Sequence, residues 1–320
     1  MERKLIGVDI GGTKCAVCIG RQQQGEMSVL ARQSFPTPLT PQETFSRIME
    51  TISLLREGHD CAAIGISCGG PLDSRSGIVY SPPNLPGWDA IDVVTPLRER
   101  FALPTWLEND ANAGALAEWL WGAGRGYRNV VFLTFGTGMG AGFVLDGRLY
   151  RGSSDLAGEV GHVRLAEQGP EGFGKAGSFE GFCGGSGIAR LGQQKAQEWL
   201  AQGEVVGYCP TLADLPQVTA ERIGHAARAG DAAALRVWEI VARRLGQGLA
   251  MLVDVLNPDC IILGSIYLRQ RELLEPLVLR VLREEALPGA LAVCRIVPAG
   301  LGEQIGDFAS LAVALHHLQE

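Results

Sequence analysis

Asp9 and the turn that follows it are the first residues of this sequence whose types and spacing suit chemistry. The segment LIGVDIGGTKCAV, residues 5–17, runs from an apolar strand into one carboxylate, then into a glycine-rich turn and a second apolar strand. A tight hairpin accounts for the glycines. It does not account for Asp9, because a carboxylate there is costly unless a cation or a hydrogen-bond donor meets it. The candidate anion-contacting residues of the turn are Gly11, Gly12, Thr13 and Lys14.

A second turn of the same design lies in VVFLTFGTGMGAGFVLDG, residues 130–147. Neither turn fits Gly-x-x-x-x-Gly-Lys-Ser/Thr or Gly-x-Gly-x-x-Gly, since a strand rather than a helix follows each of them. Glycines let backbone N–H groups approach an anion without a side chain in the way. We therefore expect the first turn, and Gly136, Thr137 and Gly138 of the second, to clamp a polyphosphate. Mg²⁺ uses one or two protein carboxylates and keeps several waters, which suits Asp9 acting through water.

Length and composition are those of an ordinary globular protein. The 320 residues favour two domains, and 46% hydrophobic with 20% charged residues is typical of a soluble chain. A net charge of −7 without a basic stripe argues against a nucleic-acid partner. The sequence shows no signal-peptide pattern and no apolar run long enough to span a bilayer, so we expect no membrane association.

The eight cysteines are scattered along the chain, which is typical of small buried hydrophobes in a reducing compartment. Cys15 and Cys18 form a Cys-x-x-Cys, but within a strand pattern residues three apart point to opposite faces. We therefore expect a cytoplasmic protein in which these two thiols do not act together.

The hydrophobic periodicity predicts two halves of similar order, separated by the glycine-rich segment 121–129. The first half is expected to contain strands 4–10, 15–20, 27–33, 62–67 and 104–107 and helices 41–57, 92–101 and 110–121. The second is expected to contain strands 130–135, 140–145, 259–264 and 292–297 and helices 187–201, 219–229, 231–256, 270–285 and 304–318. Each half opens with a glycine-turned hairpin and continues with alternating helices and strands. This pattern predicts a duplicated α/β domain with a cleft between the copies.

Four motifs in register carry a family resemblance: Asp-x-Gly-Gly-Thr-Lys at 9–14, Glu-Asn-Asp-Ala-Asn at 108–112, Gly-Thr-Gly-x-Gly at 136–140 and Gly-Glu-Val-Gly-His at 158–162. Together they resemble the ROK family of sugar kinases, within the actin-like ATPase superfamily. The resemblance implies an α/β fold of two ribonuclease-H-like lobes with a catalytic cleft between them. The implied N-terminal lobe is 1–120, with the helix 304–320 packing back on it, and the implied C-terminal lobe is 121–303. A homodimer is also implied.

The implied activity is transfer of the γ-phosphoryl group of ATP, with Mg²⁺, to a hydroxyl of a hexose. We expect the 6-hydroxyl of glucose or of an N-acetylhexosamine. Such a transfer needs alignment, charge neutralisation and a group that accepts the hydroxyl proton. Asp110 is the expected general base, with Asn109 holding a sugar hydroxyl. The alternative is that both residues only cap the helix that follows them, a position where Asn and Asp are preferred.

Three further residues align with sugar-contacting positions of the family, namely Glu159, His162 and Glu180. Planar polar groups of this kind accept pairs of hydroxyl hydrogen bonds. The alternatives are solvated loop carboxylates and a structural histidine. Gly70 and Asn84 lie in segments that match the substrate-side loops, although the proline-rich context of Asn84 equally suits a rigid turn.

Two departures from the family pattern stand out. The family usually follows its histidine with three zinc-binding cysteines, and this chain has Glu171, Phe173 and Ser178 at those positions. We therefore expect no structural zinc and a loop held by packing and hydrogen bonds. The family also has a run of glycines after the strand 259–264; here Gly264, the expected nucleotide contact, is followed by Ser265 and Ile266.

Two other functions compete with a kinase. One is a non-catalytic, sugar-sensing regulator of the same fold; such proteins carry an N-terminal DNA-binding module, whereas only the first few residues precede the first expected strand here. The other is a kinase-like binding protein with a dead site, which the intact Asp110 and both glycine turns disfavour.

Overall fold

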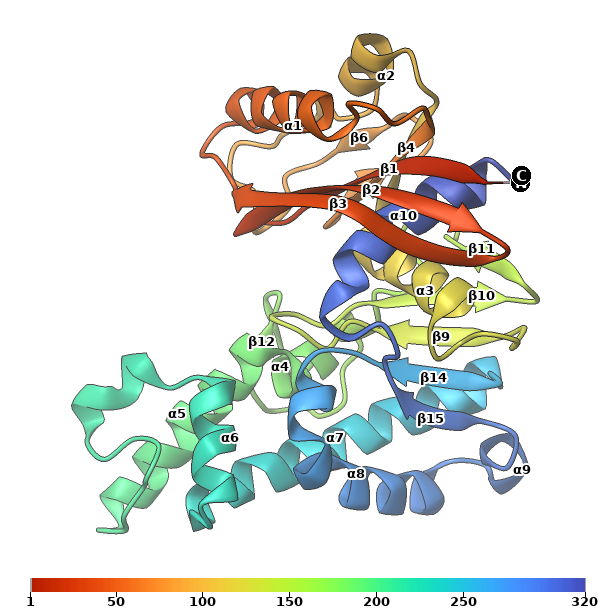
Figure 1. Ribbon diagram of the computed structural model, residues 1–320. Coiled ribbons are helices and arrows are strands. Elements are labelled where there is room, and N and C mark those ends of the chain that lie inside the picture. The colour runs from red at the N-terminus through yellow and green to blue at the C-terminus, as the bar shows by residue number, and fades with distance from the viewer. Residues whose placement is uncertain (1, 320) are drawn as a thin grey trace. The chain divides into compact units, whose positions relative to one another are not determined.

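The first sheet grows from the apolar segments at the start of the chain. In the computed structural model, which describes residues 2–319, β1 (Arg3–Ile10) pairs antiparallel with β2 (Lys14–Gln23) and parallel with β4 (Cys61–Cys68). β3 (Glu26–Pro36) and β8 (Thr105–Asn109) complete a five-stranded sheet in the order β3-β2-β1-β4-β8 (Figure 1). The parallel register β1-β4-β8 places the carboxyl ends of these three strands at one edge of the sheet.

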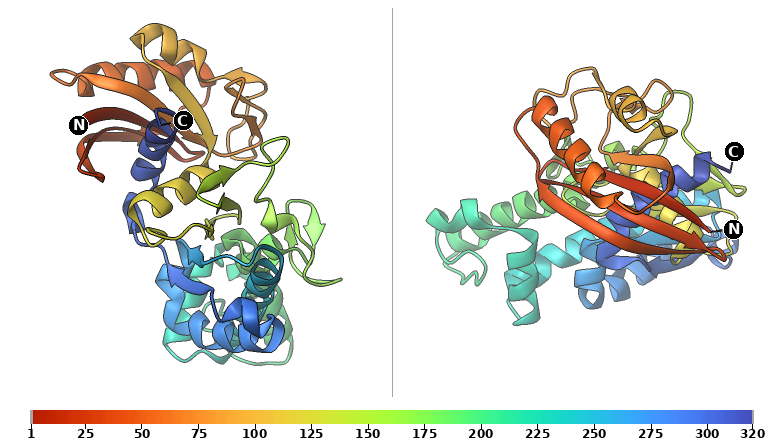
Figure 2. Two further views of the ribbon diagram at one scale, coloured as in Figure 1. Left: turned by 90° about the vertical axis from the view of Figure 1, so that its right-hand side faces the viewer. Right: turned by 45° about the horizontal axis from the view of Figure 1, so that its top comes forward.

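Helices cover both faces of this sheet (Figures 1 and 2). On one face, α1 (Pro41–Leu55) and α2 (Thr95–Phe101) bury their apolar sides against the strands. On the other, α3 (Asp110–Trp121) and the C-terminal helix α10 (Ile305–His317) do the same. Glycines at 7 and 65 permit this packing, because a Cβ at either position would lie 2.3 Å or less from an atom of Ser310.

Cys15 and Cys18 lie in different hydrophobic cores. Cys15 belongs to the core beneath α1 and α2, whereas Cys18 belongs to the core beneath α3 and α10. The alternation of side chains along β2 separates them. Both are free thiols, so the prediction that the pair would point to opposite faces is confirmed.

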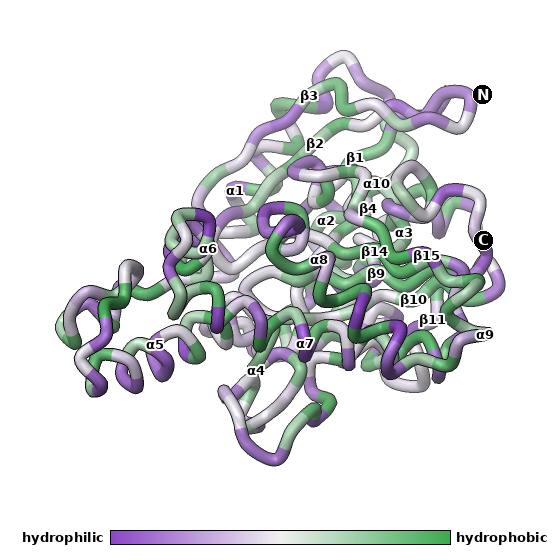
Figure 3. The backbone as a smooth tube through the Cα atoms, turned by 90° about the horizontal axis from the view of Figure 1, so that it is seen from below, coloured by the Kyte–Doolittle hydropathy of each residue, from purple (hydrophilic) through white to green (hydrophobic). Residues whose placement is uncertain are grey.

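The second sheet has the same order of strands as the first. It runs β11-β10-β9-β14-β15. In both sheets, three strands that are consecutive in the chain are followed across the sheet by two strands from later in the chain. Their bounds are β9 (Val130–Leu133), β10 (Ala141–Leu145), β11 (Arg148–Tyr150), β14 (Cys260–Leu263) and β15 (Arg295–Pro298). β14 is hydrophobic along its whole length and fully buried (Figure 3). The internal duplication expected from the sequence is therefore confirmed.

The helices of the second half pack on the long helix α7. Their bounds are α4 (Phe179–Cys183), α5 (Gly185–Ala201), α6 (Ala220–Arg228), α7 (Ala232–Leu256), α8 (Ile266–Glu285) and α9 (Pro288–Leu291). Gln270 has non-helical backbone angles, so α8 is kinked there: the helix expected at 270–285 corresponds to the part after the kink, and a short helical segment from Ile266 precedes it. No helix within residues 2–319 is both long and apolar enough to cross a membrane.

Several short elements lie between the helices and strands that the sequence predicts. They are the strands β5 (Leu72–Asp73), β6 (Ile78–Val79), β7 (Ile91–Asp92), β12 (Glu171–Gly172) and β13 (Lys175–Ala176), and the 3₁₀ turns η1 (Val160–His162), η2 (Leu212–Gln217) and η3 (Gly302–Gln304). Two-residue strands carry too little periodicity to be read from a sequence.

The chain divides into two compact units. The first comprises the chain up to Phe132, Gly142–Gly158 and the segment from Gly300 onward; the second comprises Leu133–Ala141 and Glu159–Ala299. Residues 121–132, 142–158 and 300–303, which the expected boundaries assigned to the second lobe, thus belong to the first unit. Close packing on α3 explains this difference, since a Cβ at Gly142 would lie 2.3 Å from the carbonyl oxygen of Ala111.

Glu118 holds the end of α3 to two later segments of the first unit. Its carboxylate is fully buried and accepts hydrogen bonds from the backbone N–H groups of Ala123 at 2.8 Å, Gly300 at 3.0 Å and Leu301 at 2.9 Å. We expect Glu118→Ala to lower the free energy of unfolding by roughly 3 kcal/mol, because buried donors are left unpaired. Denaturant titration measures this loss, with the exposed Glu99→Ala in α2 as control. Equal stability of the two variants would contradict the role of Glu118.

Candidate active site

Asp9 lies in an acidic cluster of the first unit, at the end of β1. Burial, followed by the negative charges of Asp110 and Asp307, raises the pKa of Asp9 to about 7, while Lys14 and Arg32 oppose the shift. Arg32 is itself engaged, since its Nε donates to Asp307 Oδ2 at 2.7 Å. A carboxyl poised in this way gains from a divalent cation, because the cation compensates the charge that burial disfavours. The hard oxygen donors of Asp9 and Asp110 suit Mg²⁺.

Asn109 and Asp110 lie where β8 passes into α3, and the structure separates their roles. Asn109 is the N-cap: its Oδ1 accepts from the N–H of Ala111 at 2.9 Å and of Asn112 at 3.4 Å. The capping interpretation therefore applies to Asn109. Asp110 is the first helical residue, and it is exposed. Its Oδ1 accepts a hydrogen bond from the adjacent Ala111 N–H at 2.8 Å.

Glu108 braces this turn from the buried side. Its Oε1 accepts from the N–H of Asn109 and from Asn112 Nδ2, both at 3.0 Å, and its Oε2 accepts from Arg151 Nε at 2.6 Å. The carboxylate is fully buried, which raises the pKa of Glu108, while Arg151 acts against that shift. The direction of the Asp110 side chain thus rests on a hydrogen-bonded frame rather than on a mobile loop.

Of the expected substrate-side residues of the first unit, Gly70 lies beside this turn and Asn84 lies beside the first glycine turn. A Cβ at Gly70 would lie 3.2 Å from Asn109 Nδ2, and one at Gly69 would lie 4.0 Å from Asp110 Oδ2. Gly12 lies against the other predicted loop, because a Cβ there would be 2.4 Å from the carbonyl oxygen of Asn84. The absence of a side chain at Gly12 therefore serves this contact as well as any approach to phosphate.

The remaining residues of the first glycine turn are accessible. The N–H of Gly11 donates to the carbonyl oxygen of Lys14 at 3.2 Å and closes the turn. Thr13 and Lys14 are exposed. The first unit thus brings together the predicted metal residue, the predicted base and the predicted substrate loops.

In the second unit, Glu159, His162 and Glu180 form a second polar group. Glu159 precedes η1, His162 ends it, and Glu180 lies in α4. Burial and then the charge of Glu180 raise the pKa of Glu159, whereas His162 lowers it, which shows that the three side chains are close enough to interact. Glu180 Oε2 also accepts from the N–H of Met139 at 2.9 Å, so the second glycine turn and this polar group are connected.

Gly138 lies against Glu180 of this polar group. A Cβ at Gly138 would lie 2.7 Å from Glu180 Oε2. A larger residue at position 138 would therefore displace Glu180. We expect substitutions of Gly138 to affect both groups of residues and not phosphate contacts alone.

The loop after His162 is held by its own hydrogen bonds. Ser178 is fully buried, and its Oγ accepts from the N–H of Gly181 at 3.1 Å and donates to the carbonyl oxygen of Gly172 at 3.4 Å. Lys175 Nζ donates to the carbonyl oxygen of His162 at 2.8 Å, and Arg164 donates to a carbonyl of the same loop. Packing and hydrogen bonds thus hold this segment, in the way the sequence predicts for a loop without the cysteines. Across residues 2–319, no group of three His, Cys, Asp or Glu side chains is arranged to hold a metal ion.

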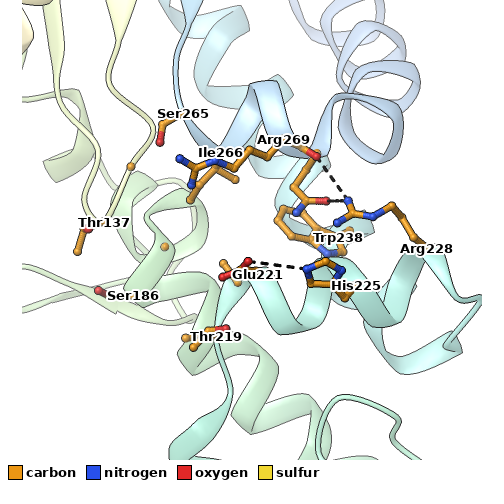
Figure 4. Close-up of a pocket in the computed structure, with 15 residues that line it drawn as sticks. Thr137, Ser186, Thr219, Glu221, His225, Arg228, Trp238, Ser265, Ile266 and Arg269 are labelled. Carbon is orange, nitrogen blue, oxygen red and sulfur yellow. Dashed lines mark hydrogen bonds and ion pairs between the residues drawn. The ribbon is translucent and has the colours of Figure 1, made fainter. Parts of the chain in front are cut away.

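A cavity of about 780 Å³ opens in the second unit beside the second glycine turn (Figure 4). Its near end is lined by Gly136 and Thr137 and by the first residues of α5 and α8. The N-caps of these helices, Gly184 and Ser265, make no side-chain cap hydrogen bond. The first N–H groups of these helices are already used, since those of Gly185, Ser186 and Ile266 donate to backbone carbonyl oxygens. The donors left at this end are the hydroxyl groups of Thr137, Ser186 and Ser265, which line the cavity. This end of the cavity fits phosphate groups.

Trp238, His225 and Arg228 line the far end of the cavity (Figure 4). Trp238 is buried there, and its Nε1 has no hydrogen-bond partner. Arg228 donates to Gln270 Oε1 at 2.6 Å, and His225 lies 3.8 Å from a Glu221 oxygen. An aromatic wall with several donors and acceptors suits a nucleotide base and ribose.

The sequence located only part of this cavity. Gly136 and Thr137 line it, whereas Gly264 lies just outside its lining, and Ser265 and Ile266 take that place. The sequence analysis did not identify Ser186 or the α6 residues as part of the cavity lining. The run Gly184-Gly185-Ser186-Gly187 directly before a predicted helix was the available signal.

Comparison with known proteins decides the family. The model of the ROK family matches residues 5–316. The chain belongs to the ROK family. This ROK protein is 35% identical over 263 residues to a glucokinase of Streptomyces coelicolor, covering 81% of each chain. It is 31% identical to a glucokinase of Thermotoga maritima, covering 97% of this chain and 96% of that one.

The fold agrees with that assignment. The crystal structure of a ROK family glucokinase from Streptomyces griseus, in complex with glucose and AMPPNP, matches with a TM-score of 0.78 and 30% identity. The match covers 98% of this ROK protein and 99% of that chain. The expected family and the expected fold class are therefore confirmed.

Proposed function

We propose that this protein is an ATP-dependent glucose kinase that transfers the γ-phosphoryl group of ATP to the 6-hydroxyl of the sugar. As a ROK protein similar over nearly its whole length to glucokinases, it is a sugar kinase. The observation that carries the proposal is the closeness of Asp9 and Asp110 in the first unit, where the charge of Asp110 helps to raise the pKa of Asp9.

The first unit supplies the acceptor chemistry in this proposal. Asp110 accepts the proton of the attacking hydroxyl, and its exposure leaves it open to a substrate. Asn109 uses Oδ1 as a cap and keeps Nδ2 for a sugar hydroxyl. Gly70 lies beside Asn109, and Asn84 lies beside Gly12 of the first glycine turn; both contribute to the sugar site in this proposal.

In the second unit, Glu159, His162 and Glu180 recognise the sugar hydroxyls. Their closeness supports this role, because paired planar groups reject analogues that lack the matching hydroxyls. His162 is exposed, which leaves its ring open to a ligand.

The nucleotide binds in the cavity of the second unit. Its phosphates contact Gly136 and the hydroxyl groups of Thr137, Ser186 and Ser265, with Gly138 and Gly264 shaping the turns behind them. The turn Gly11, Gly12, Thr13 and Lys14 contributes further phosphate contacts. When bound, Mg²⁺ neutralises charge on the phosphates; Asp9 would hold it through water.

We also propose that the protein is cytoplasmic and forms a homodimer, with sugar and ATP as its small-molecule partners and no nucleic-acid or membrane partner. The free cysteines favour a reducing compartment.

A coupled ADP-release assay with ATP, Mg²⁺ and a panel of hexoses and N-acetylhexosamines tests the activity. We expect glucose or an N-acetylhexosamine to give the highest kcat/KM. If no sugar releases ADP while sugar binding is retained in calorimetry, the alternative of a sugar-sensing regulator takes over, and a gel-shift assay with DNA then tests it.

We expect the purified protein to contain no structural zinc. Residues 171–178 offer no thiolate, and the nearest cysteine, Cys183, is buried with its Sγ directed at the carbonyl oxygen of Val241. Metal analysis of protein purified without chelator should find far less than one zinc per chain, and EDTA followed by excess Mg²⁺ should leave the sugar KM unchanged. About one zinc per chain would contradict this expectation.

A further inference from the structure

Phe173 occupies a turn position that aromatic residues rarely take. β12 and β13 form a hairpin whose two turn residues are Phe173 and Gly174, with φ values of 46° and 71°. Two-residue hairpins with positive φ at both positions favour Asn or Asp followed by Gly. A bulky residue with positive φ is strained.

Two other hairpins of this chain show what the turn ordinarily carries. Gln24 and Gly25 join β2 to β3 with φ values of 55° and 87°, and Asp146 and Gly147 join β10 to β11 with values of 53° and 75°. Both first positions hold polar residues. Phe173 is therefore the exception among three equivalent turns.

The fold gains little from the Phe173 ring. It is 70% exposed, the largest fraction for any phenylalanine among the described residues. Strain and exposure of an apolar ring both cost stability, so a position that keeps them points to a function.

The ring lies next to a residue of the proposed sugar site. Its centroid is 6.2 Å from that of His162, with the rings at 76°. The same hairpin is tied to this histidine, since Lys175 Nζ donates to the carbonyl oxygen of His162 at 2.8 Å. The hairpin is thus held beside His162, and Phe173 at its tip lies next to the histidine ring.

We propose that Phe173 is an acceptor-specificity residue whose ring forms an apolar wall for the sugar beside His162. A pyranose presents hydroxyls at its edge and C–H groups on its faces. Glu159, Glu180 and His162 supply groups for the hydroxyls, and Phe173 supplies the surface for a C–H face. This inference rests on the proposed sugar kinase activity.

Phe173→Asn tests it, because the substitution removes the ring and relieves the turn at once. We expect the sugar KM to rise by about threefold to tenfold, the ATP KM to stay unchanged and the melting temperature to stay equal or rise. Phe173→Tyr should restore the sugar KM. Gln24→Asn makes the same turn improvement in the first unit, so it should raise the melting temperature without altering either KM.

An unchanged sugar KM in Phe173→Asn would overturn the inference, as would an equal rise in both KM values. A change of oligomeric state, seen by light scattering, with an unchanged sugar KM would assign the ring to a contact with a second copy instead. Calorimetry separates this inference from the proposed function. Weaker sugar binding by the variant supports the wall even if the wild type releases no ADP, and a wild type that binds no sugar overturns both.

Discussion

Asp110→Asn should lower kcat by about 10²–10⁴-fold while leaving the fold and sugar binding nearly intact. The asparagine keeps the size of the side chain but cannot accept the hydroxyl proton, and general-base catalysis contributes about this factor. The fold should tolerate the change because Asp110 is exposed and the cap of α3 is supplied by Asn109. The frame of Glu108, Asn112 and Arg151 stays in place.

Steady-state kinetics and calorimetry of sugar binding measure the two sides of this prediction. Asp60→Asn makes the same chemical change on an exposed aspartate of the first unit and should leave kcat unchanged. If Asp110→Asn keeps more than about a tenth of the wild-type kcat, another group accepts the proton.

Asp9→Asn should raise the Mg²⁺ concentration needed for half-maximal rate by about 10–100-fold. This is the usual effect of losing a group that hydrogen-bonds to a metal ligand, here a bound water. The sugar KM should change far less, because Asp9 is assigned to the metal and not to the acceptor. Equal changes in the requirements for Mg²⁺ and for sugar would refute this assignment.

The same carboxyl predicts a pH dependence. Because the pKa of Asp9 is raised to about 7, the group is mostly protonated near pH 6, and Mg²⁺ must displace that proton. The Mg²⁺ requirement of the wild type should therefore be about tenfold higher at pH 6 than at pH 8. In Asp9→Asn this difference should disappear. Asp307→Asn, which removes a neighbouring negative charge, should move the transition to lower pH.

Without Mg²⁺, the free energy of unfolding should decrease as the pH rises, whereas Mg²⁺ binding should improve over the same range. A carboxyl whose pKa is raised on folding holds its proton more tightly in the folded state than in the unfolded one, so its contribution to stability is lost as pH rises from about 4 to 7. Above pH 7 the wild type keeps a half-buried negative charge, whereas Asp9→Asn does not. At pH 8 and without Mg²⁺, the variant should melt at a higher temperature than the wild type.

The sequence by itself determined the family, the duplicated α/β order and most of the chemistry-bearing residues. Asp9, Asp110 and the two glycine turns were visible because a carboxylate beside glycines at the end of an apolar strand has few purely structural explanations. The missing cysteines were equally visible, since zinc ligation depends on residue types that a sequence shows directly. Long helices and strands were found because their periodicity extends over several turns or pleats.

Only the tertiary structure decided how those residues are used. It assigned the cap to Asn109 and left Asp110 exposed, a distinction that depends on backbone angles at one junction. It showed that Gly136 and Thr137 line one cavity with the first residues of α5 and α8, which are some eighty residues apart in the chain, and that Gly264 is not in that lining. It also placed Phe173 beside His162 through a two-residue turn. Such contacts arise from long-range packing and from single φ angles, and neither leaves a periodic signal in the sequence.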